Sequence, residues 1–344
     1  MSRRALTLLV AGIGAVVLAL AGAVLPVPYV VLSPGPTINT LGTFQREKLI
    51  QVSGHRVYPT TGHLNLVTVS FQGGPGDEIN LFTALQAWLS PHDAVVPQEE
   101  LFGKNTNVQQ VEQQNVREMT DSQALATAAA LRELKIPFQT YVGIVQVIKG
   151  MPASGKLQAG DLITAVDGKP VGGNSGLSAR LIRSRKPGAP VTLTISRHGR
   201  VQKVRLTTKS QNGQAAVGIV VQPQYKFPFT VKIKVGDIGG PSAGMMFALG
   251  LIDMLSPENL TGGKFIAGTG EIDQKGNVGA IGGIQQKMIG ARNQGATIFL
   301  APASNCRDVR GAVPAGLRVV KVSTLAQAVQ DLKALNAHKP VPSC

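Results

Sequence analysis

The stretch Gly239-Gly240-Pro241-Ser242-Ala243-Gly244 places one serine in a glycine-flanked turn, directly before an apolar run from Met245 to Leu255 that predicts a helix. A serine in this position is exposed and held on a tight backbone. It also lies beside the N–H groups of a helix N-terminus, which can bind an oxyanion. This is the setting that a nucleophile requires, so we expect Ser242 to be catalytic.

A lysine in a similar setting follows further along the chain. Lys287 lies in the stretch Ile281-Gly282-Gly283-Ile284-Gln285-Gln286-Lys287-Met288-Ile289, where a glycine turn again opens a helical pattern. Serine and lysine together can form a catalytic dyad in which the amine activates the hydroxyl. The pattern therefore predicts Ser242 and Lys287 as the catalytic pair.

The serine turn also satisfies a second, unrelated motif. Residues 240–244 match G-x-S-x-G, the nucleophile elbow of α/β-hydrolases, in which an acid and then a histidine follow the serine. Of the five histidines only His338 follows Ser242, and it lies in a basic, proline-containing tail. Because this tail is a poor catalytic scaffold, the hydrolase triad is disfavoured.

Composition narrows the classes of partner and cofactor. The 344 residues can bury more than one core, and the formal net charge is +15. The basic residues are scattered, and no aromatic-interleaved basic patch or helix-turn-helix spacing occurs, so we expect no nucleic-acid partner. Two cysteines without a histidine cluster also argue against a zinc site. We therefore expect neither a metal nor a cofactor.

The N-terminus predicts a membrane anchor. After Arg3 and Arg4, residues 5–25 carry no charge and are numerous enough to cross the ~30 Å hydrocarbon core as a helix. The two arginines predict that residues 1–4 are cytoplasmic and that the chain after Pro26 is extracytoplasmic, in a single-pass protein of the cell membrane. A cleaved signal peptide is the alternative, because residues 21–23 resemble a cleavage site. The length of the apolar stretch favours the uncleaved anchor.

The two cysteines, Cys306 and Cys344, both lie near the C-terminus. In an oxidising compartment a lone pair of cysteines is bridged more often than free. The extracytoplasmic placement therefore predicts a disulfide between them.

The middle of the chain, from Tyr141 to about Val221, consists of short strands joined by glycine turns. It contains the runs Gly143-Ile144-Val145, Pro152-Ala153-Ser154, Ala159-Gly160-Asp161-Leu162-Ile163 and Val166-Asp167-Gly168-Lys169-Pro170-Val171. With these runs the segment resembles the PDZ domains attached to bacterial envelope proteases. The resemblance implies a small β-barrel-like sandwich with helices. A spacer module is the alternative.

The PDZ resemblance also implies a binding site. Such domains capture an extended peptide at a sheet edge, and N–H groups at the strand entry receive its terminal carboxylate. By resemblance Gly143, Ile144 and Val145 form that loop, and the helix near Leu181 forms the other wall.

The segment around the serine carries a further set of motifs. They are Gly240-Pro241-Ser242-Ala243-Gly244, Thr269-Gly270-Glu271-Ile272, Gly276-Asn277-Val278, Ile281-Gly282-Gly283, Lys287, and the run from Ala291 to Pro302. In this order they resemble the proteolytic domain of the Lon family. The resemblance implies that Ser242 is the nucleophile, that Lys287 is the general base and that Thr269 supports the lysine. An acidic residue is common in the family where Gly239 stands here, and it is open whether the nearby Asp237 substitutes for it.

The ATP-dependent members of that family carry an AAA+ motor. Residues 150–157 satisfy the first part of G-x-x-x-x-G-K-[ST], but Leu157 replaces the hydroxyl residue that should bind Mg²⁺. The match also lies inside the PDZ-like segment, so we interpret it as chance. The sequence therefore predicts an ATP-independent serine endopeptidase that acts on unfolded or flexible polypeptides.

Two earlier segments complete the domain organisation. Residues 62–69 and 118–126 resemble the first strands and first helix of the Lon proteolytic domain, which predicts that the PDZ domain is inserted into the protease domain. We therefore expect an α+β chain with a Lon-type α/β proteolytic domain. Its expected parts are residues 1–4 (cytoplasmic), 5–25 (transmembrane helix), 26–44 (linker), 45–135 (first part of the protease domain), 136–222 (PDZ), 223–336 (catalytic part) and 337–344 (tail).

Two points about function stay open at this stage. The alternative function is a membrane-anchored PDZ adaptor whose protease domain is inactive, although the retained Ser242, Lys287 and Thr269 argue against it. The expected partners are polypeptide substrates and the bacterial membrane. Because domains of the Lon type commonly form rings, a homo-oligomer is a further possible assembly.

Overall fold

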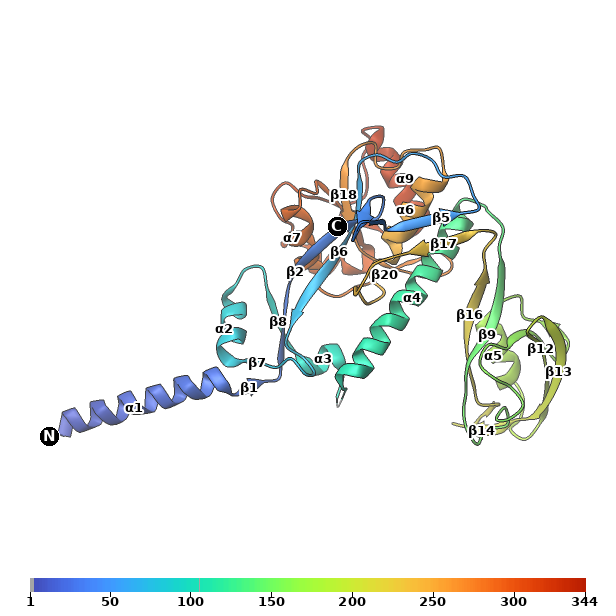
Figure 1. Cartoon of the computed structure of the whole chain (residues 1–344), viewed down its shortest axis with the longest axis horizontal. Helices are drawn as coiled ribbons and strands as arrows, with labels where there is room; N and C mark the ends of the chain where they lie inside the picture. The colour runs from blue at the N-terminus through green and yellow to red at the C-terminus, as the bar shows by residue number, and fades with distance from the viewer. Residues whose placement is uncertain (1–2, 105) are drawn as a thin grey trace. The chain divides into compact units, whose positions relative to one another are not determined.

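The computed structural model describes residues 3–104 and 106–344, which divide into two compact units (Figure 1). The first unit comprises residues 1–135 and 229–344 and is called the discontinuous unit below. The second comprises Ile136–Pro228 and is called the inserted unit, because it interrupts the sequence of the first. The expected α+β fold with an insertion is confirmed.

A six-stranded mixed sheet forms the centre of the discontinuous unit. Its strands, in spatial order, are β22 (Arg318–Val322), β21 (Ile298–Pro302), β18 (Phe265–Gly268), β6 (His63–Gln72), β2 (Tyr29–Asn39) and β8 (Ala94–Pro97). The first four are parallel, whereas β2 and β8 are antiparallel to their neighbours. The parallel part is therefore built from segments on both sides of the insertion.

The strand β2 corrects one expectation, since residues 26–44 do not form a free linker. Val30 and Val31 are buried in β2, which pairs with both β6 and β8. The register with β6 shifts between Pro34 and Thr37, so the regular ladder is interrupted at Gly35 and Pro36. Burial of a β-branched run thus outweighs the local preference of proline and glycine for a linker.

Helices pack on both faces of this sheet. They are α4 (Val108–Glu133), α6 (Gly244–Leu255), α7 (Ile284–Asn293) and α9 (Leu325–Asn336). Ala267 of β18 packs in one cluster with Ile284 and Met288 of α7. The adjacent Gly268 faces α6, since a Cβ there would lie 2.8 Å from the sulfur of Met246. Because side chains alternate along a strand, β18 lies between α6 and α7.

The inserted unit contains an antiparallel sheet and one helix. The sheet order is β13 (Arg200–Thr207), β12 (Pro190–Arg197), β10 (Leu162–Val166), β9 (Gln139–Val147) and β16 (Ile219–Lys226), with β11 (Lys169–Pro170) beside β10. The helix α5 (Ser175–Arg183) contributes Ile182 to a core built mainly from β-branched residues and leucines. The short strand pair β14 (Lys209–Gln211) and β15 (Gln214–Ala216) precedes β16.

The N-terminal helix α1 (Arg3–Val24) is, within the described part of the chain, the one helix long and apolar enough to cross a membrane. A signal sequence near an N-terminus has the same character. The remaining elements are β1 (Pro26–Val27), β3 (Thr43–Phe44), β4 (Glu47–Lys48), β5 (Ile50–Ser53), β7 (Ile79–Asn80), α2 (Leu81–Leu89), α3 (Gln98–Phe102), β17 (Thr230–Ile233), β19 (Glu271–Ile272), β20 (Val278–Gly279), η1 (Ala303–Asn305) and α8 (Cys306–Val309).

Candidate active site

Ser242 lies in a turn just before α6, and neighbouring segments hold the turn from two sides. Its carbonyl oxygen accepts hydrogen bonds from the Gly270 N–H at 2.8 Å and from the Thr269 hydroxyl at 3.0 Å. From the other side, the Ser122 hydroxyl of α4 donates to the carbonyl of Pro241 at 3.0 Å. Gly240 has φ +85°, a conformation that favours glycine. These bonds fix the backbone that carries the serine hydroxyl.

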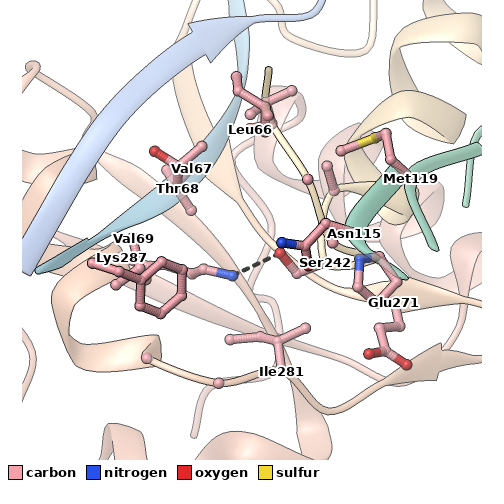
Figure 2. A pocket seen from close by; sticks show the side chains of 18 of the residues that line it. Leu66, Val67, Thr68, Val69, Asn115, Met119, Ser242, Glu271, Ile281 and Lys287 are labelled. Carbon is pink, nitrogen blue, oxygen red and sulfur yellow. Dashed lines mark hydrogen bonds between the residues drawn. The ribbon is translucent and has the colours of Figure 1, made fainter. Parts of the chain in front are cut away.

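Lys287 lies in the first turns of α7, and its side chain is 4% exposed. Its amine nitrogen Nζ is 2.8 Å from Ser242 Oγ and 3.2 Å from Thr269 Oγ1, and Figure 2 shows it directed at the serine. The helix α7 begins directly after its N-cap Gly283, whose φ of +66° and close approach to Val69 leave no room for a side chain. The double-glycine turn thus sets the position from which the lysine reaches the serine.

Burial changes the acid–base chemistry of this lysine. Desolvation lowers the pKa of Lys287 from 10.5 to about 8, while the carboxylate of Glu271 acts in the opposite direction. A lysine with its ordinary pKa would be about 0.03% neutral at pH 7, whereas one with a pKa of about 8 is roughly 10% neutral. The site therefore holds an amine that can accept a proton near neutral pH.

The dyad opens into a cleft of about 470 Å³ within the discontinuous unit. One part of its wall is apolar, with Leu66, Val67, Met119 and Ile281 around the space next to the serine (Figure 2). The segment Val67-Thr68-Val69 of β6 also lines the cleft. The cleft therefore offers both backbone and apolar side chains beside Ser242.

Two acidic residues line the same cleft. Asp237, which the sequence offered as a supporting residue, belongs to its wall, although the hydrogen bonds at the Lys287 amine come from Ser242 and Thr269. Glu271 was not selected from the sequence. Burial raises the pKa of Glu271, and the nearby Glu118 raises it further. The sequence signal that could have indicated Glu271 as a residue of the site is its position directly after Thr269 and Gly270.

Asn115 was also missed. It lies in α4 and lines the cleft, and its carbonyl oxygen accepts a hydrogen bond of 3.4 Å from the N–H of Gly240. A Cβ on Gly239 would lie 2.7 Å from the Cβ of Asn115, so the helix approaches the serine turn closely. No motif connects Asn115 to this turn, since the two segments meet only through the packing of α4 on α6.

The alternative hydrolase triad finds no support in the geometry. None of the described residues that line the cleft is a histidine. His338 follows the end of α9, in the segment after Asn336. The serine turn therefore has lysine, and not histidine, as its basic partner.

The structure corrects the expected peptide site of the inserted unit. Gly143, Ile144 and Val145 belong to β9, an inner strand paired with β10 on one side and β16 on the other. The backbone of Ile144 is itself engaged, since its N–H donates to Asp161 and its carbonyl accepts from Gly160. A peptide cannot be added at a strand that already has two neighbours. These three residues therefore do not form a receiving loop.

A groove lies elsewhere in the inserted unit, between α5 and the start of the last strand, β16. It is lined by Ala179, Ile182 and Arg183 of the helix and by the segment from Gln214 to Val221. The helix α5 thus forms one wall of this groove, whereas Leu181 packs against the core and does not line the groove. The sequence Val217-Gly218-Ile219, similar in character to Val142-Gly143-Ile144, is the one at the groove.

Residues 150–157, which partly match an ATP-binding loop, lie in the same inserted unit. Residues 150–157 form turns, and no helix follows them, as a phosphate-binding loop would require. The side chain of Leu157 is 5% exposed and belongs to the hydrophobic core. The residue that departs from the motif is thus a packing residue.

The two cysteines are joined in the structure. Cys306, at the start of α8, and Cys344 form a disulfide with a Cα–Cα distance of 5.0 Å. The C-terminal segment is also held by the Lys321 N–H, which donates to the carbonyl of Pro342 at 3.0 Å. The tail therefore lies against the edge of the sheet that carries β22.

Comparisons with known proteins identify two domains in the chain. Residues 230–335 match the model of the Lon protease (S16) C-terminal proteolytic domain, and residues 107–208 match the PDZ domain model. The PDZ match begins at Asn107, the N-cap of α4, and thus ahead of the inserted unit, which starts at Ile136. The chain thus carries a serine peptidase domain of the Lon type together with a PDZ domain.

Parts of the chain are also similar to individual proteins. The chain is 31% identical over 144 residues to the Lon protease of Neorickettsia sennetsu, covering 38% of this chain and 17% of the relative. It is 29% identical over 117 residues to Lon protease 1 of Bacillus subtilis, covering 32% and 15% respectively. The chain thus spans less than a fifth of the length of these relatives. Among solved structures, the PDZ domain of the SdrC-like protein from Listeria innocua is 28% identical, with 24% of this chain and 92% of that chain covered and a TM-score of 0.23.

Proposed function

We propose that the protein is an ATP-independent serine endopeptidase in which Ser242 and Lys287 form the catalytic dyad. The observation that carries the proposal is the 2.8 Å contact between the Lys287 amine and the Ser242 hydroxyl, together with a lysine pKa of about 8. A buried amine of lowered pKa beside a serine is the combination that general-base activation of a hydroxyl requires.

Each group has a distinct role in the proposed reaction. Ser242 Oγ attacks the peptide carbonyl while Lys287 takes its proton, and the same proton is then passed to the leaving amine. The α6 N-terminus has no side-chain cap, so the N–H groups of Ser242 and Ala243 supply the oxyanion site. Water then cleaves the acyl-enzyme, with Lys287 again the base. Thr269 holds both the amine and the Ser242 carbonyl in place.

The proposed substrates are unfolded or flexible polypeptides. Residues 150–157 cannot supply the Mg²⁺ ligand of an ATP site, since Leu157 lies in a hydrophobic core. Such an enzyme acts without ATP on segments that already reach the cleft. Cleavage of a denatured protein should therefore be the same with and without ATP, and a rate increase that depends on ATP hydrolysis would contradict this part of the proposal.

The PDZ groove is proposed to bind an extended peptide by strand addition at β16. The strand lies at one end of its sheet, and α5 provides the opposite wall with the small side chain of Ala179. Ala179→Arg should fill the groove and slow cleavage of protein substrates more than that of short peptides, because remote binding is lost only for the former. Arg180→Ala, at the next and exposed position, is the matched control.

Membrane anchoring is part of the proposal. The helix α1 is 22 residues long, and Arg3 and Arg4 at its start favour a cytoplasmic N-terminus. The disulfide between Cys306 and Cys344 is consistent with an oxidising, extracytoplasmic environment for the discontinuous unit. The proposed enzyme is therefore held at the outer side of the membrane.

A serine-directed covalent probe tests the dyad. The full chain should react at Ser242 with a fluorophosphonate and should cleave a denatured protein, and Ser242→Ala should abolish both. The matched control is Ser256→Ala, at the other end of α6, which should retain both. A chain that binds peptides but neither reacts nor cleaves would be a membrane-anchored PDZ adaptor, which is the competing function.

A further inference from the structure

The short helix α2 (Leu81–Leu89) exposes its large apolar side chains and buries its small ones. Its two buried residues are Ala84 and Ala87, which pack with Val31 and Ile79. The exposed ones are Leu81 (43% exposed), Phe82 (49%), Leu85 (44%), Trp88 (72%) and Leu89 (77%). A helix whose outer face met only water would show the opposite distribution.

These five residues form one continuous face. At about 100° per residue, the positions of Leu81, Phe82, Leu85, Trp88 and Leu89 fall within roughly 120° of each other around the helix axis. The helix contains no charged residue. The apolar face is thus wide enough, and continuous enough, to contact an extended apolar phase.

The helix α2 lies next to the end of α1, the helix of membrane-spanning length. The strand β1, which begins two residues after the end of α1, pairs with β7 directly before α2, with Pro26 opposite Asn80. Gly22, in the last turn of α1, is buried against α2, and a Cβ there would lie 3.4 Å from Phe82 Cε2. Figure 1 shows α2 beside this end of α1. The apolar face is therefore continuous with the proposed membrane-spanning helix.

The length of α1 sets the depth of α2. With 22 residues at about 1.5 Å each, α1 measures about 33 Å, close to the ~30 Å hydrocarbon core. The whole helix is needed to cross, so its last turn lies at the outer boundary of the core. Side chains that pack on Gly22 lie at the same level, where tryptophan is also preferred.

We propose that α2 is a membrane-contacting helix that inserts Leu81, Phe82, Leu85, Trp88 and Leu89 into the outer leaflet. The inference rests on the proposed membrane anchor. Its occupant is the lipid bilayer, because α1 brings α2 to the bilayer surface whether or not a second copy of the chain is present. The discontinuous unit, with its cleft, is thereby held against the membrane at a second point besides α1.

The single tryptophan of the chain makes the test direct, since Trp88 alone reports its surroundings by fluorescence. The full chain is reconstituted into vesicles of phosphatidylcholine and phosphatidylglycerol, with or without brominated acyl chains. We expect blue-shifted Trp88 emission, strong quenching by the brominated lipids and at least a fivefold lower acrylamide quenching constant than in the unfolded chain.

Two variants separate lipid contact from folding. Leu85→Gln combined with Leu89→Gln changes only exposed positions of the face, so the fold should persist, while quenching by brominated lipid should fall at least twofold. Val201→Gln, at a 70% exposed position of the inserted unit, is the matched control and should leave the quenching unchanged.

Each outcome is decisive. If the chain stays in the vesicles after an alkaline wash but Trp88 is accessible to acrylamide, the inference is wrong and the anchor stands. If Trp88 emission is blue-shifted but brominated lipids do not quench it, the face is covered by protein, such as a second copy, and the inference is again wrong. Loss of the chain on washing overturns the anchor and the inference together, while peptidase activity is measured independently.

Discussion

The pH dependence of cleavage follows from the state of Lys287. Only the neutral amine can take the proton of Ser242, and burial lowers the pKa of Lys287 to about 8. The neutral fraction is then about 1% at pH 6, about 10% at pH 7 and about half at pH 8. We therefore expect kcat/KM to rise about tenfold from pH 6 to pH 7, to reach half its maximum near pH 8 and to level off above about pH 9.

The size of the effect shows what burial contributes. With the ordinary pKa of 10.5, the neutral fraction at pH 7 would be about 300-fold smaller than with a pKa of about 8. Lys287→Arg keeps the positive charge at all these pH values and should show no turnover even at pH 9. Ser242→Ala and Lys287→Ala should each abolish cleavage, and the double variant should be no worse, because the pair acts as a unit.

The assay is initial-rate cleavage of an internally quenched peptide by the full chain between pH 5.5 and 10. The peptide has blocked termini and no histidine, lysine or acidic residue, so that only the enzyme titrates. The fold is followed at each pH by circular dichroism. A profile that is flat across this range, a midpoint near 6.5, or clear turnover by folded Lys287→Arg would show that another group is the base.

Three further results are expected. Glu271→Gln should move the midpoint of the pH profile to lower pH, because the Glu271 carboxylate raises the lysine pKa; an upward shift would contradict this placement of the charges. Lys287→Met should raise the free energy of unfolding in urea by up to about 3 kcal/mol below pH 8, because the folded state no longer has to hold a buried charged lysine whose pKa is lowered from 10.5 to about 8. This gain should shrink as the pH rises from about 8 to 10.5, where the lysine becomes neutral in both states. A gain that grows with pH would refute the reasoning. Loss of the disulfide in Cys306→Ala should cost roughly 4 kcal/mol in the chain-entropy model, and thiol labelling of both cysteines in the unreduced wild type would show that Cys344 is not bridged.

Local sequence signals were sufficient for most elements and for the two central residues. The apolar run from Met245 to Leu255 indicated α6, because this helix is buried throughout. Glycine turns before α6 and α7 indicated Ser242 and Lys287 as candidate site residues, because such turns mark the start of a helix. The order of the motifs around them indicated that they belong to one site, and the structure brings their side chains to 2.8 Å.

The groove beside α5 shows where local signals mislead. Two similar runs, Val142-Gly143-Ile144 and Val217-Gly218-Ile219, occur in the inserted unit. Either run could start a strand, and the residues of the two runs do not show which strand is an inner strand and which lies at the end of the sheet. That difference is set by which strands pair, and pairing places β9 between β10 and β16.

The sequence by itself determined the class of chemistry and an N-terminal helix of membrane-spanning length, because both depend on residue type and spacing along the chain. The insertion of one unit into another was indicated by the resemblance of residues 62–69 and 118–126 to the Lon proteolytic domain. The tertiary structure alone decided the lowered pKa of Lys287, the roles of Glu271 and Asn115 in the cleft wall and the outward apolar face of α2. Desolvation, proximity and exposure depend on what packs around a residue from distant parts of the chain, and periodicity within one element does not contain that information.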